Sequence, residues 1–300
     1  MKILLLGKDG QVGRELQRTL PPFGNLIALG RDDANLSDLK GLRDLLYIHA
    51  PDIIVNAAAY TAVDKAESDE AAAYRINAEA VGVLADYARF NGSLLVHYST
   101  DYVFDGEKPG AYIETDTTHA LSAYGRSKRS GEEAVMQGGC HYLVFRTSWV
   151  YSAHGHNFIK TILRLAKEKD SLNVVSDQIG TPTSAELIAD VTGLAIAAYY
   201  ADMLPEGFYH LTASGETSWY ELACYVIEKA AAMGAQMKLD VTKIHPIATE
   251  EYPLPARRPK NSCLDHSKLA ARLGFPLPDW RFHVDRVIDQ LIRQEIADET

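Results

Sequence analysis

The chain has few of the features that mark secreted, membrane-bound or nucleic-acid-binding proteins. Its 300 residues include only three cysteines, which are far apart in the sequence and favour neither a disulfide framework nor a zinc site. No run of about 18 uncharged apolar residues occurs that could cross a membrane. Basic residues are outnumbered, with 30 Lys and Arg against 40 Asp and Glu. This balance disfavours nucleic acids and anionic membranes as partners, and we expect a cytoplasmic protein with reduced thiols.

Apolar residues, by contrast, are plentiful: 47% of the chain is hydrophobic, which is enough for a substantial core. Short apolar runs alternate with helical patterns through the first half. Strands are predicted at residues 2–7, 25–30, 52–58, 93–99 and 141–147, and helices at 11–20, 38–49, 70–91 and 124–137. The alternation predicts an α/β fold with a doubly wound parallel sheet of the Rossmann type, whose carboxyl edge should bind the ligand.

Beyond residue 150 the pattern becomes irregular. Helices are predicted at residues 157–168, 185–200, 218–233 and 282–296, and prolines punctuate the stretch before the last helices. We therefore predict a dinucleotide-binding domain over residues 1–150. A smaller, interleaved C-terminal domain over residues 151–300 should bind mainly substrate, with some later segments returning to the first domain.

A cluster of glycines follows the first predicted strand. Gly7, Gly10 and Gly13 have the spacing G-x-x-G-x-x-G, and apolar residues follow them at helical spacing. Such glycines let a nucleotide cofactor approach the backbone at a helix N-terminus. The spacing is typical of the short-chain dehydrogenase/reductase superfamily, particularly its extended branch. The alternative is a glycine-rich turn that binds no ligand.

The residues after the second strand bear on the choice of cofactor. An arginine there accommodates the 2′-phosphate of NADP, whereas an acidic residue binds the ribose hydroxyl of NAD. Arg31 favours NADPH, but Asp32 and Asp33 follow it directly, and a solvated turn arginine is an equally open interpretation. We expect both NADPH and NADH to be used, with NADPH preferred.

Tyr124 and Lys128 share one face of a predicted helix because they are four residues apart. A free phenol has a pKa of about 10, so it does not readily lose and regain its proton at neutral pH. We therefore expect the charge of Lys128 to lower that pKa. Thr100, just past the fourth strand, could donate its hydroxyl to the same substrate oxygen. These three candidate catalytic residues predict carbonyl reduction, in which Tyr124 supplies a proton and the cofactor a hydride. The alternative is a chance pair on an exposed helix.

Four longer strings resemble the dTDP-4-dehydrorhamnose reductase family. They occupy residues 56–67 (NAAAYTAVDKAE), 98–106 (YSTDYVFDG), 145–151 (FRTSWVY) and 258–262 (RPKNS), and the resemblance extends from the first strand to about residue 280. It implies reduction of the C4 keto group of dTDP-4-dehydro-L-rhamnose by NADPH or NADH, the last step of dTDP-rhamnose biosynthesis. The implied partner is a dTDP-sugar, and a homodimer is left open.

The same resemblance implies roles for individual residues. The cofactor would be bound by Gly10, Gln11 and Val12 at the pyrophosphate, by Ala58, Ala59 and Tyr60 along the dinucleotide, and by Asn35 and Leu36 near the adenine. The sugar nucleotide would be contacted by Thr100, Asp101, Trp149 and Arg258, the last at the diphosphate. Asn35 departs from the family pattern, which more often has Asp. Trp149 has a second interpretation as an ordinary aromatic between domains.

Tyr102 separates this chain from related sugar-nucleotide dehydratases. Those enzymes resemble Thr-Asp-Glu at residues 100–102 and need the Glu to abstract a proton at C5. Without that acid and base pair, elimination is disfavoured and simple carbonyl reduction remains.

A magnesium site is a weaker implication of the resemblance. Some family members carry Mg²⁺ between subunits on carboxylates that would correspond to Glu15 and Glu186. A third family carboxylate falls at Gln290, and the loss of one oxygen ligand makes surface carboxylates the favoured interpretation.

Two other functions share much of this pattern. The regulatory subunit of methionine adenosyltransferase looks like this family, binds NADP and acts as a partner instead of a catalyst, but its segment lacks the tryptophan found here at residue 149. A reductase of another nucleotide-linked deoxysugar would share the whole constellation.

Overall fold

A six-stranded parallel sheet forms the centre of the molecule. The computed structural model describes residues 1–298, and side chains through residue 294. The strands lie in the order β10-β5-β4-β3-β1-β2, and every neighbouring pair is parallel. They are β1 (Lys2–Leu6), β2 (Asn25–Leu29), β3 (Ile53–Asn56), β4 (Leu94–Thr100), β5 (His141–Thr147) and β10 (Gly207–His210). The order reverses between β1 and β3, where doubly wound sheets bind ligands, and the predicted α/β fold is confirmed.

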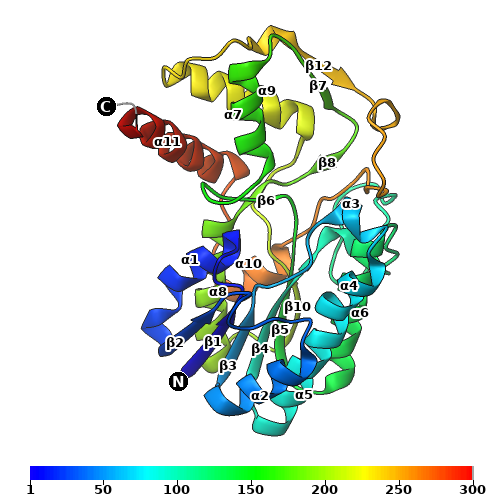
Figure 1. Cartoon of the computed structure of the whole chain (residues 1–300), viewed down its shortest axis with the longest axis vertical. Helices are drawn as coiled ribbons and strands as arrows, with labels where there is room; N and C mark the ends of the chain where they lie inside the picture. The colour runs from blue at the N-terminus through cyan, green and yellow to red at the C-terminus, as the bar shows by residue number, and fades with distance from the viewer. Residues whose placement is uncertain (299–300) are drawn as a thin grey trace.

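Helices cover both faces of the sheet (Figure 1). One face is covered by α1 (Gln11–Thr19) and α8 (Ala185–Tyr200), the other by α2 (Leu39–His49), α5 (Ala80–Asn91) and α6 (Ala123–Gly138). Successive side chains of a strand point to opposite faces, so Val96 and Tyr98 of β4 join the α8 core whereas Leu95 joins the α5 core. This alternation also directs His97 toward α6.

The single helix predicted over residues 70–91 is wrong in one respect, because it is interrupted. It consists of α4 (Glu70–Tyr74), a π-helical turn (Arg75–Glu79) and α5. At this turn α6 approaches closely, since a Cβ on Gly131 would lie 2.1 Å from the carbonyl oxygen of Asn77. Single π-helical turns inside α-helices frequently occur at functional sites.

The second half of the chain builds a lobe beside the carboxyl edge of the sheet (Figure 1). Its main elements are α7 (Phe158–Glu168), α9 (Trp219–Ala232), α11 (Trp280–Asp298) and the parallel pair of β7 (Leu172–Val175) with β12 (Ile244–Ile247). Because α8 and β10 lie with the sheet, a boundary at residue 150 does not separate the two layers cleanly, and the division into domains stays a prediction. Shorter elements are α3 (Val63–Ala66), α10 (Ser267–Leu273), β6 (Val150–Tyr151), β8 (Ile179–Gly180), β9 (Thr183–Ser184), β11 (Thr217–Ser218) and 3₁₀ turns at Pro21–Phe23, Asp101–Val103, Val241–Lys243 and Thr249–Glu251.

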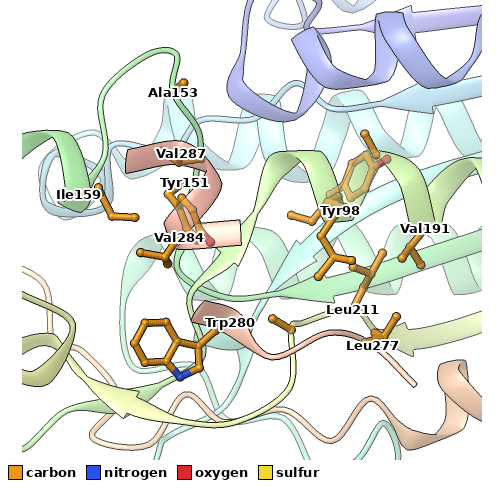
Figure 2. Packing of buried hydrophobic residues seen from close by; sticks show 14 of the residues in the cluster. Tyr98, Tyr151, Ala153, Ile159, Val191, Leu211, Leu277, Trp280, Val284 and Val287 are labelled. Carbon is orange, nitrogen blue, oxygen red and sulfur yellow. The ribbon is translucent and has the colours of Figure 1, made fainter. Parts of the chain in front are cut away.

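One hydrophobic core joins this lobe to the sheet (Figure 2). Val284 and Val287 of α11 pack with Tyr151 and Ile159, and the same cluster includes Val191 of α8. Full burial of an aliphatic side chain of this size is worth about 1.5–3 kcal/mol, so the lobe is held firmly beside the sheet edge. Within residues 1–298 no helix combines the length and apolar character needed to cross a bilayer.

Candidate active site

The predicted site residues lie at one edge of the sheet. Gly7 follows β1, Arg31 follows β2, Ala58 follows β3, Thr100 ends β4, and Trp149 follows β5. The strands are parallel, so their carboxyl ends meet at the same edge, which is the ligand-binding edge of doubly wound folds. Residues spread over nearly half the chain therefore converge.

The glycine loop between β1 and α1 has the shape of an anion cradle. Gly7 has φ +88°, and a Cβ there would lie 2.8 Å from the backbone nitrogen of Ala58, whereas a Cβ on Gly13 would lie 2.0 Å from the carbonyl oxygen of Gly7. Gly10 caps α1 without a side-chain hydrogen bond, and the first turn holds no acidic residue. The first N–H groups of a helix lack intrahelical partners and attract anions. The loop therefore fits a dinucleotide pyrophosphate, and Val12 lies in that first turn.

The side chain of Gln11 is hydrogen-bonded to other residues of the protein. Its Oε1 accepts hydrogen bonds from Asn157 Nδ2 at 2.9 Å and from Ser152 Oγ at 3.3 Å, while its Nε2 donates to the Val150 carbonyl at 3.5 Å. These bonds hold residues 150–157 across the start of α1. The backbone N–H of Gln11 remains as the group for the predicted pyrophosphate contact.

In the segment after β2, an arginine is exposed to solvent and an aspartate is held in an ion pair. Arg31 is exposed, whereas the Asp33 carboxylate accepts a hydrogen bond from Lys8 Nζ at 2.7 Å, and that bond lowers the pKa of Asp33. The Asn35 side chain accepts bonds within its own turn, and Leu36 is buried in the core. A role of Asn35 and Leu36 near the adenine stays a prediction.

Asn77, which the sequence analysis missed, ties the loop after β3 to α6. Its Oδ1 accepts from the backbone N–H of Tyr60 at 2.8 Å, and its Nδ2 donates to the Tyr60 carbonyl at 3.0 Å and to Ser127 Oγ at 2.9 Å. Ser127 Oγ in turn donates to the Tyr124 carbonyl at 2.7 Å. The loop of Ala58, Ala59 and Tyr60 is therefore fixed to the helix that carries the candidate acid.

The side chains of Thr100 and Tyr124 interact through a hydrogen bond, and their catalytic roles stay a prediction. Thr100 Oγ1 donates to Asp101 Oδ1 at 2.9 Å and accepts from the Tyr102 backbone N–H at 3.2 Å. Burial, followed by the charge of Asp101, raises the pKa of Tyr124 above its ordinary value, and a hydrogen bond with Thr100 opposes this shift. The arrangement presents a protonated phenol beside a fixed hydroxyl.

The contacts of Lys128 differ from those expected for a lysine that acts on Tyr124. Its Nζ donates to the Tyr98 carbonyl at 2.6 Å and lies 3.2 Å from His97 Nε2. The predicted lowering of the pKa of Tyr124 by Lys128 is wrong in this structure, because the amine is directed to β4 and burial dominates the phenol. Burial also lowers the pKa of Lys128 to about 8, against the charge of Glu132.

Further polar groups are buried where β4 and β5 end. Burial raises the pKa of Asp101 to about 6, although hydrogen bonds from Ser262 and Thr100 oppose the shift. Among the described residues, Ser99 Oγ and Thr147 Oγ1 have no hydrogen-bond partner. Buried polar atoms are normally paired, so these two hydroxyls are exceptions at the carboxyl ends of β4 and β5.

Arg258 lies beside the site but is engaged by a carboxylate. Its Nη2 and Nη1 contact the two oxygens of Asp64 at 2.7 and 3.1 Å, and this bond lowers the pKa of Asp64. The ring of Tyr102 meets that of Tyr124 edge to face at 5.6 Å. Contact between Arg258 and a diphosphate would have to use the outer edge of the guanidinium, and it stays a prediction.

Trp149 packs against the second lobe. Its ring stacks on Trp219 with centroids 3.5 Å apart, and Phe158 lies 4.6 Å from the same Trp219 ring. The backbone of Trp149 has φ +47°, a conformation that is rare for a bulky residue and is often found at functional sites. These contacts support the interpretation as an aromatic between lobes, and the sugar contact stays a prediction.

The two carboxylates considered for Mg²⁺ are paired with arginines. Glu15 lies 3.3 Å from Arg18 Nε, and Glu186 lies 2.7 Å from Arg286 Nη2. The part of the chain that the structure describes contains no group of three His, Cys, Asp or Glu that could hold a metal. These residues do not fit a Mg²⁺ site, and their ion pairs favour the interpretation as surface carboxylates.

Comparison with known proteins agrees with this geometry. The family described as the RmlD substrate binding domain matches residues 1–293. The dTDP-4-dehydrorhamnose reductase of Burkholderia thailandensis is 49% identical over 98% of this chain and 100% of its own length. The chain belongs to the dTDP-4-dehydrorhamnose reductase family. The family resemblance found in the sequence is thereby confirmed.

Solved structures of this family superpose on nearly the whole chain. The reductase of Clostridium acetobutylicum has a TM-score of 0.89 and 36% identity, covering 97% of this chain and 99% of its own. The reductase of Bacillus anthracis, solved in complex with NADP, has a TM-score of 0.85 and 32% identity, covering 98% and 99%.

Proposed function

We propose that the protein reduces the C4 keto group of dTDP-4-dehydro-L-rhamnose to dTDP-L-rhamnose with NADPH or NADH. The observation that carries the proposal is the meeting of the Thr100 and Tyr124 hydroxyls at the sheet edge that also holds the glycine loop. Membership of the reductase family supports the substrate, and the NADP complex of the Bacillus anthracis relative supports the cofactor.

The chain's own residues contribute one proton to the reaction. When bound, the nicotinamide supplies a hydride to C4. Tyr124 donates its phenolic proton to the oxygen on C4 as negative charge develops there, and its raised pKa keeps the phenol protonated before the reaction. Thr100 is oriented by Asp101 and by the Tyr102 N–H, which fixes its oxygen where it can contact the same substrate atom.

Neighbouring residues restrict the reaction to reduction. Tyr102 stands where a dehydratase needs a glutamate base, so no carboxylate base follows Asp101 to remove the C5 proton. Lys128, one turn from Tyr124 on α6, is assigned to the nicotinamide ribose, and exposed Arg31 to the 2′-phosphate of NADPH. NADPH is therefore the preferred cofactor in this proposal.

Oxidation of NADPH by the purified protein tests the proposal against its alternatives. Turnover is expected with dTDP-4-dehydro-L-rhamnose and not with GDP-linked 4-keto sugars. Faster turnover of another nucleotide sugar would favour a reductase of a different deoxysugar. Absence of turnover with all of them, combined with capture of a methionine adenosyltransferase, would favour the regulatory-subunit alternative.

The setting of the reaction is also proposed. Cys140, Cys224 and Cys263 are free thiols, which suits the reducing cytoplasm because disulfides are rare there. A homodimer stays a prediction, which sedimentation of the purified protein would test.

A further inference from the structure

Two indole rings stack where the second lobe meets the carboxyl edge of the sheet. Trp149 follows β5 and Trp219 begins α9, and their ring centroids lie 3.5 Å apart with 11° between the ring planes. The strand β6, which follows Trp149 directly, lies between the sheet and the lobe (Figure 1). One face of the Trp149 ring is therefore covered by the second lobe, and a ligand can contact only the remainder of the ring.

Gly180 of β8 lies against the same indole. A Cβ at this position would lie 2.5 Å from Cε2 of Trp149 and 2.8 Å from its Cζ2 and Nε1. Gly180 does not have a positive φ, so its backbone conformation is open to other residues. Glycine inside a strand often marks a position where another group approaches closely. Here that group is the Trp149 ring, which occupies the space of the missing side chain.

The backbone of Trp149 is held in an unfavourable conformation. A φ of +47° is rare for a bulky residue and costs free energy that the surrounding contacts must offset. The Trp149 carbonyl accepts a hydrogen bond from the Thr183 backbone N–H at 3.3 Å. Just before it, Ser148 Oγ donates to the Thr181 carbonyl at 3.0 Å. The segment from β8 to β9 thus fixes the backbone that carries the indole as well as contacting the ring.

Trp219 is held by contacts of its own. Its Nε1 donates to Gln178 Oε1 at 3.2 Å, and Gln178 Nε2 donates to Thr249 Oγ1 at 3.1 Å. A capping box formed by Ser218 and Glu221 fixes the first turn of α9, in which Trp219 lies. Trp219 is therefore a fixed surface on which a second ring can be ordered.

We propose that Trp219 and Gly180 are positioning residues, which hold the Trp149 ring where it contacts the sugar of the substrate. The inference rests on the proposed function and deepens it, because it names residues that act on the substrate through another side chain. Thr147, two residues before Trp149, is paired with Thr100 in the register of β5 and β4. This pairing places the held indole close in the chain to the candidate catalytic edge.

Kinetics of NADPH oxidation with dTDP-4-dehydro-L-rhamnose test the role of Trp219. A ring that is already ordered lowers the cost of binding, and an aromatic pair contributes about two- to tenfold to an equilibrium. Trp219→Ala should raise the KM for the sugar nucleotide by about that factor, with a smaller change in kcat and none in the KM for NADPH. Trp219→Phe keeps a ring in the stack and should recover most of the loss. An unchanged KM for the sugar nucleotide in Trp219→Ala would overturn the inference.

Gly180→Ala displaces the same ring from another direction. Its methyl group needs the space of the Trp149 indole, so the KM for the sugar nucleotide should rise while the KM for NADPH stays the same. Gly82→Ala is the matched control, because Gly82 also lacks a positive φ and its Cβ would lie an ordinary 3.8 Å from Ala134. The control should leave both KM values unchanged. Wild-type kinetics in Gly180→Ala would contradict the inference.

A double-mutant cycle shows whether Trp219 acts through Trp149. In the Trp149→Ala background, Trp219→Ala should cause no further rise in KM, because the ring that it orders is already absent. An additive rise would mean that Trp219 acts on the substrate or the fold directly, and would overturn the inference. Trp280→Phe controls for a general loss of stability. Trp280 is buried on α11 against Tyr225, and its substitution should leave the KM for the sugar nucleotide unchanged.

Proton and nitrogen-15 NMR of the indole groups follows the stack without turnover. The chain has three tryptophans, so single substitutions assign all three signals. The Trp149 signal should move in Trp219→Ala and in Gly180→Ala, because a neighbouring ring shifts it, and should stay in place in Trp280→Phe. A Trp149 signal that moves in neither of the first two variants would overturn the inference. If the wild-type protein turns over no nucleotide sugar, the proposed function fails, whereas normal turnover with an unchanged KM in Trp219→Ala is a failure of this inference alone.

Discussion

The two sides of the candidate site are built from different parts of the chain. The cofactor side is made of backbone, because Gly7 and Gly13 place peptide groups where a side chain would collide. The carbonyl side is made of side chains, because Thr100 and Tyr124 meet only through the packing of α6 on β4. At Gly7 and Gly13 the cradle leaves no room for a Cβ. The activity of the side-chain cluster depends instead on the protonation of its members.

This difference suggests two kinds of sensitivity. A methyl group added to the cradle should damage folding and cofactor binding together. Removal of a single oxygen from the side-chain cluster should leave the fold intact and abolish the chemistry. Substitutions on the two sides of the site test this separation.

Tyr124→Phe should have the largest effect. It removes the proton donor but keeps the ring that meets Tyr102 at 5.6 Å, and general acid catalysis contributes about 10²–10⁴-fold to a rate. We expect kcat to fall by that factor while NADPH binding, followed by fluorescence, is retained. Tyr102→Phe is the matched control and should lose far less activity. Equal losses in the two variants would contradict the assignment of the acid.

Gly7→Ala should damage the cradle more than an alanine at a glycine with open surroundings. Gly7 and Gly110 have similar φ angles of +88° and +82°, but only at Gly7 would a Cβ approach other atoms within 4 Å. Gly110→Ala should therefore lower the free energy of unfolding only by the cost of the left-handed conformation, which is about 1–2 kcal/mol. Gly7→Ala should cost more in urea unfolding and also weaken NADPH binding, because the Ala58 backbone must shift. Identical losses of stability in the two variants would contradict the close approach of a Gly7 Cβ to the Ala58 backbone.

Arg31→Ala should affect one cofactor only. A hydrogen bond to a charged phosphate is worth about 1.5–3 kcal/mol, so the KM for NADPH should rise about tenfold or more. The KM for NADH should stay the same, which makes NADH the internal control. An equal change for both cofactors would identify Arg31 as a general surface charge.

Asp64→Asn should have the smallest effect, and that effect should depend on pH. Arg258 holds the folded-state pKa of Asp64 below its ordinary value, so the ion pair stabilises the fold above the ordinary aspartate pKa and loses this contribution as pH falls through the lowered value. The pair is partly exposed, and its worth is about 0.2–1 kcal/mol. Urea unfolding should distinguish wild type from the variant near neutral pH, and the difference should shrink as pH falls below the ordinary aspartate pKa. A difference that persists in acid would mean that the amide disturbs packing.

The sequence predicts the cofactor side better than the carbonyl side for a physical reason. Glycine spacing after a strand directly encodes the backbone cradle, and period-2 and helical patterns located the strands that end at the site. The contacts of His97 and Asn77 depend on partners 31 to 50 positions away, which no local pattern encodes. The direction of Lys128 was mispredicted for the same reason, since its position on α6 is local but the carbonyl that it binds is not.

The most direct test of the account is a crystal structure of the protein with NADP⁺ and dTDP-L-rhamnose. If Tyr124 and Thr100 have the proposed roles, the C4 hydroxyl of the sugar lies within hydrogen-bonding distance, about 2.7–2.8 Å, of both Tyr124 Oη and Thr100 Oγ1. A C4 hydroxyl bound by other side chains, with the Tyr124 hydroxyl directed away from the sugar, would contradict it.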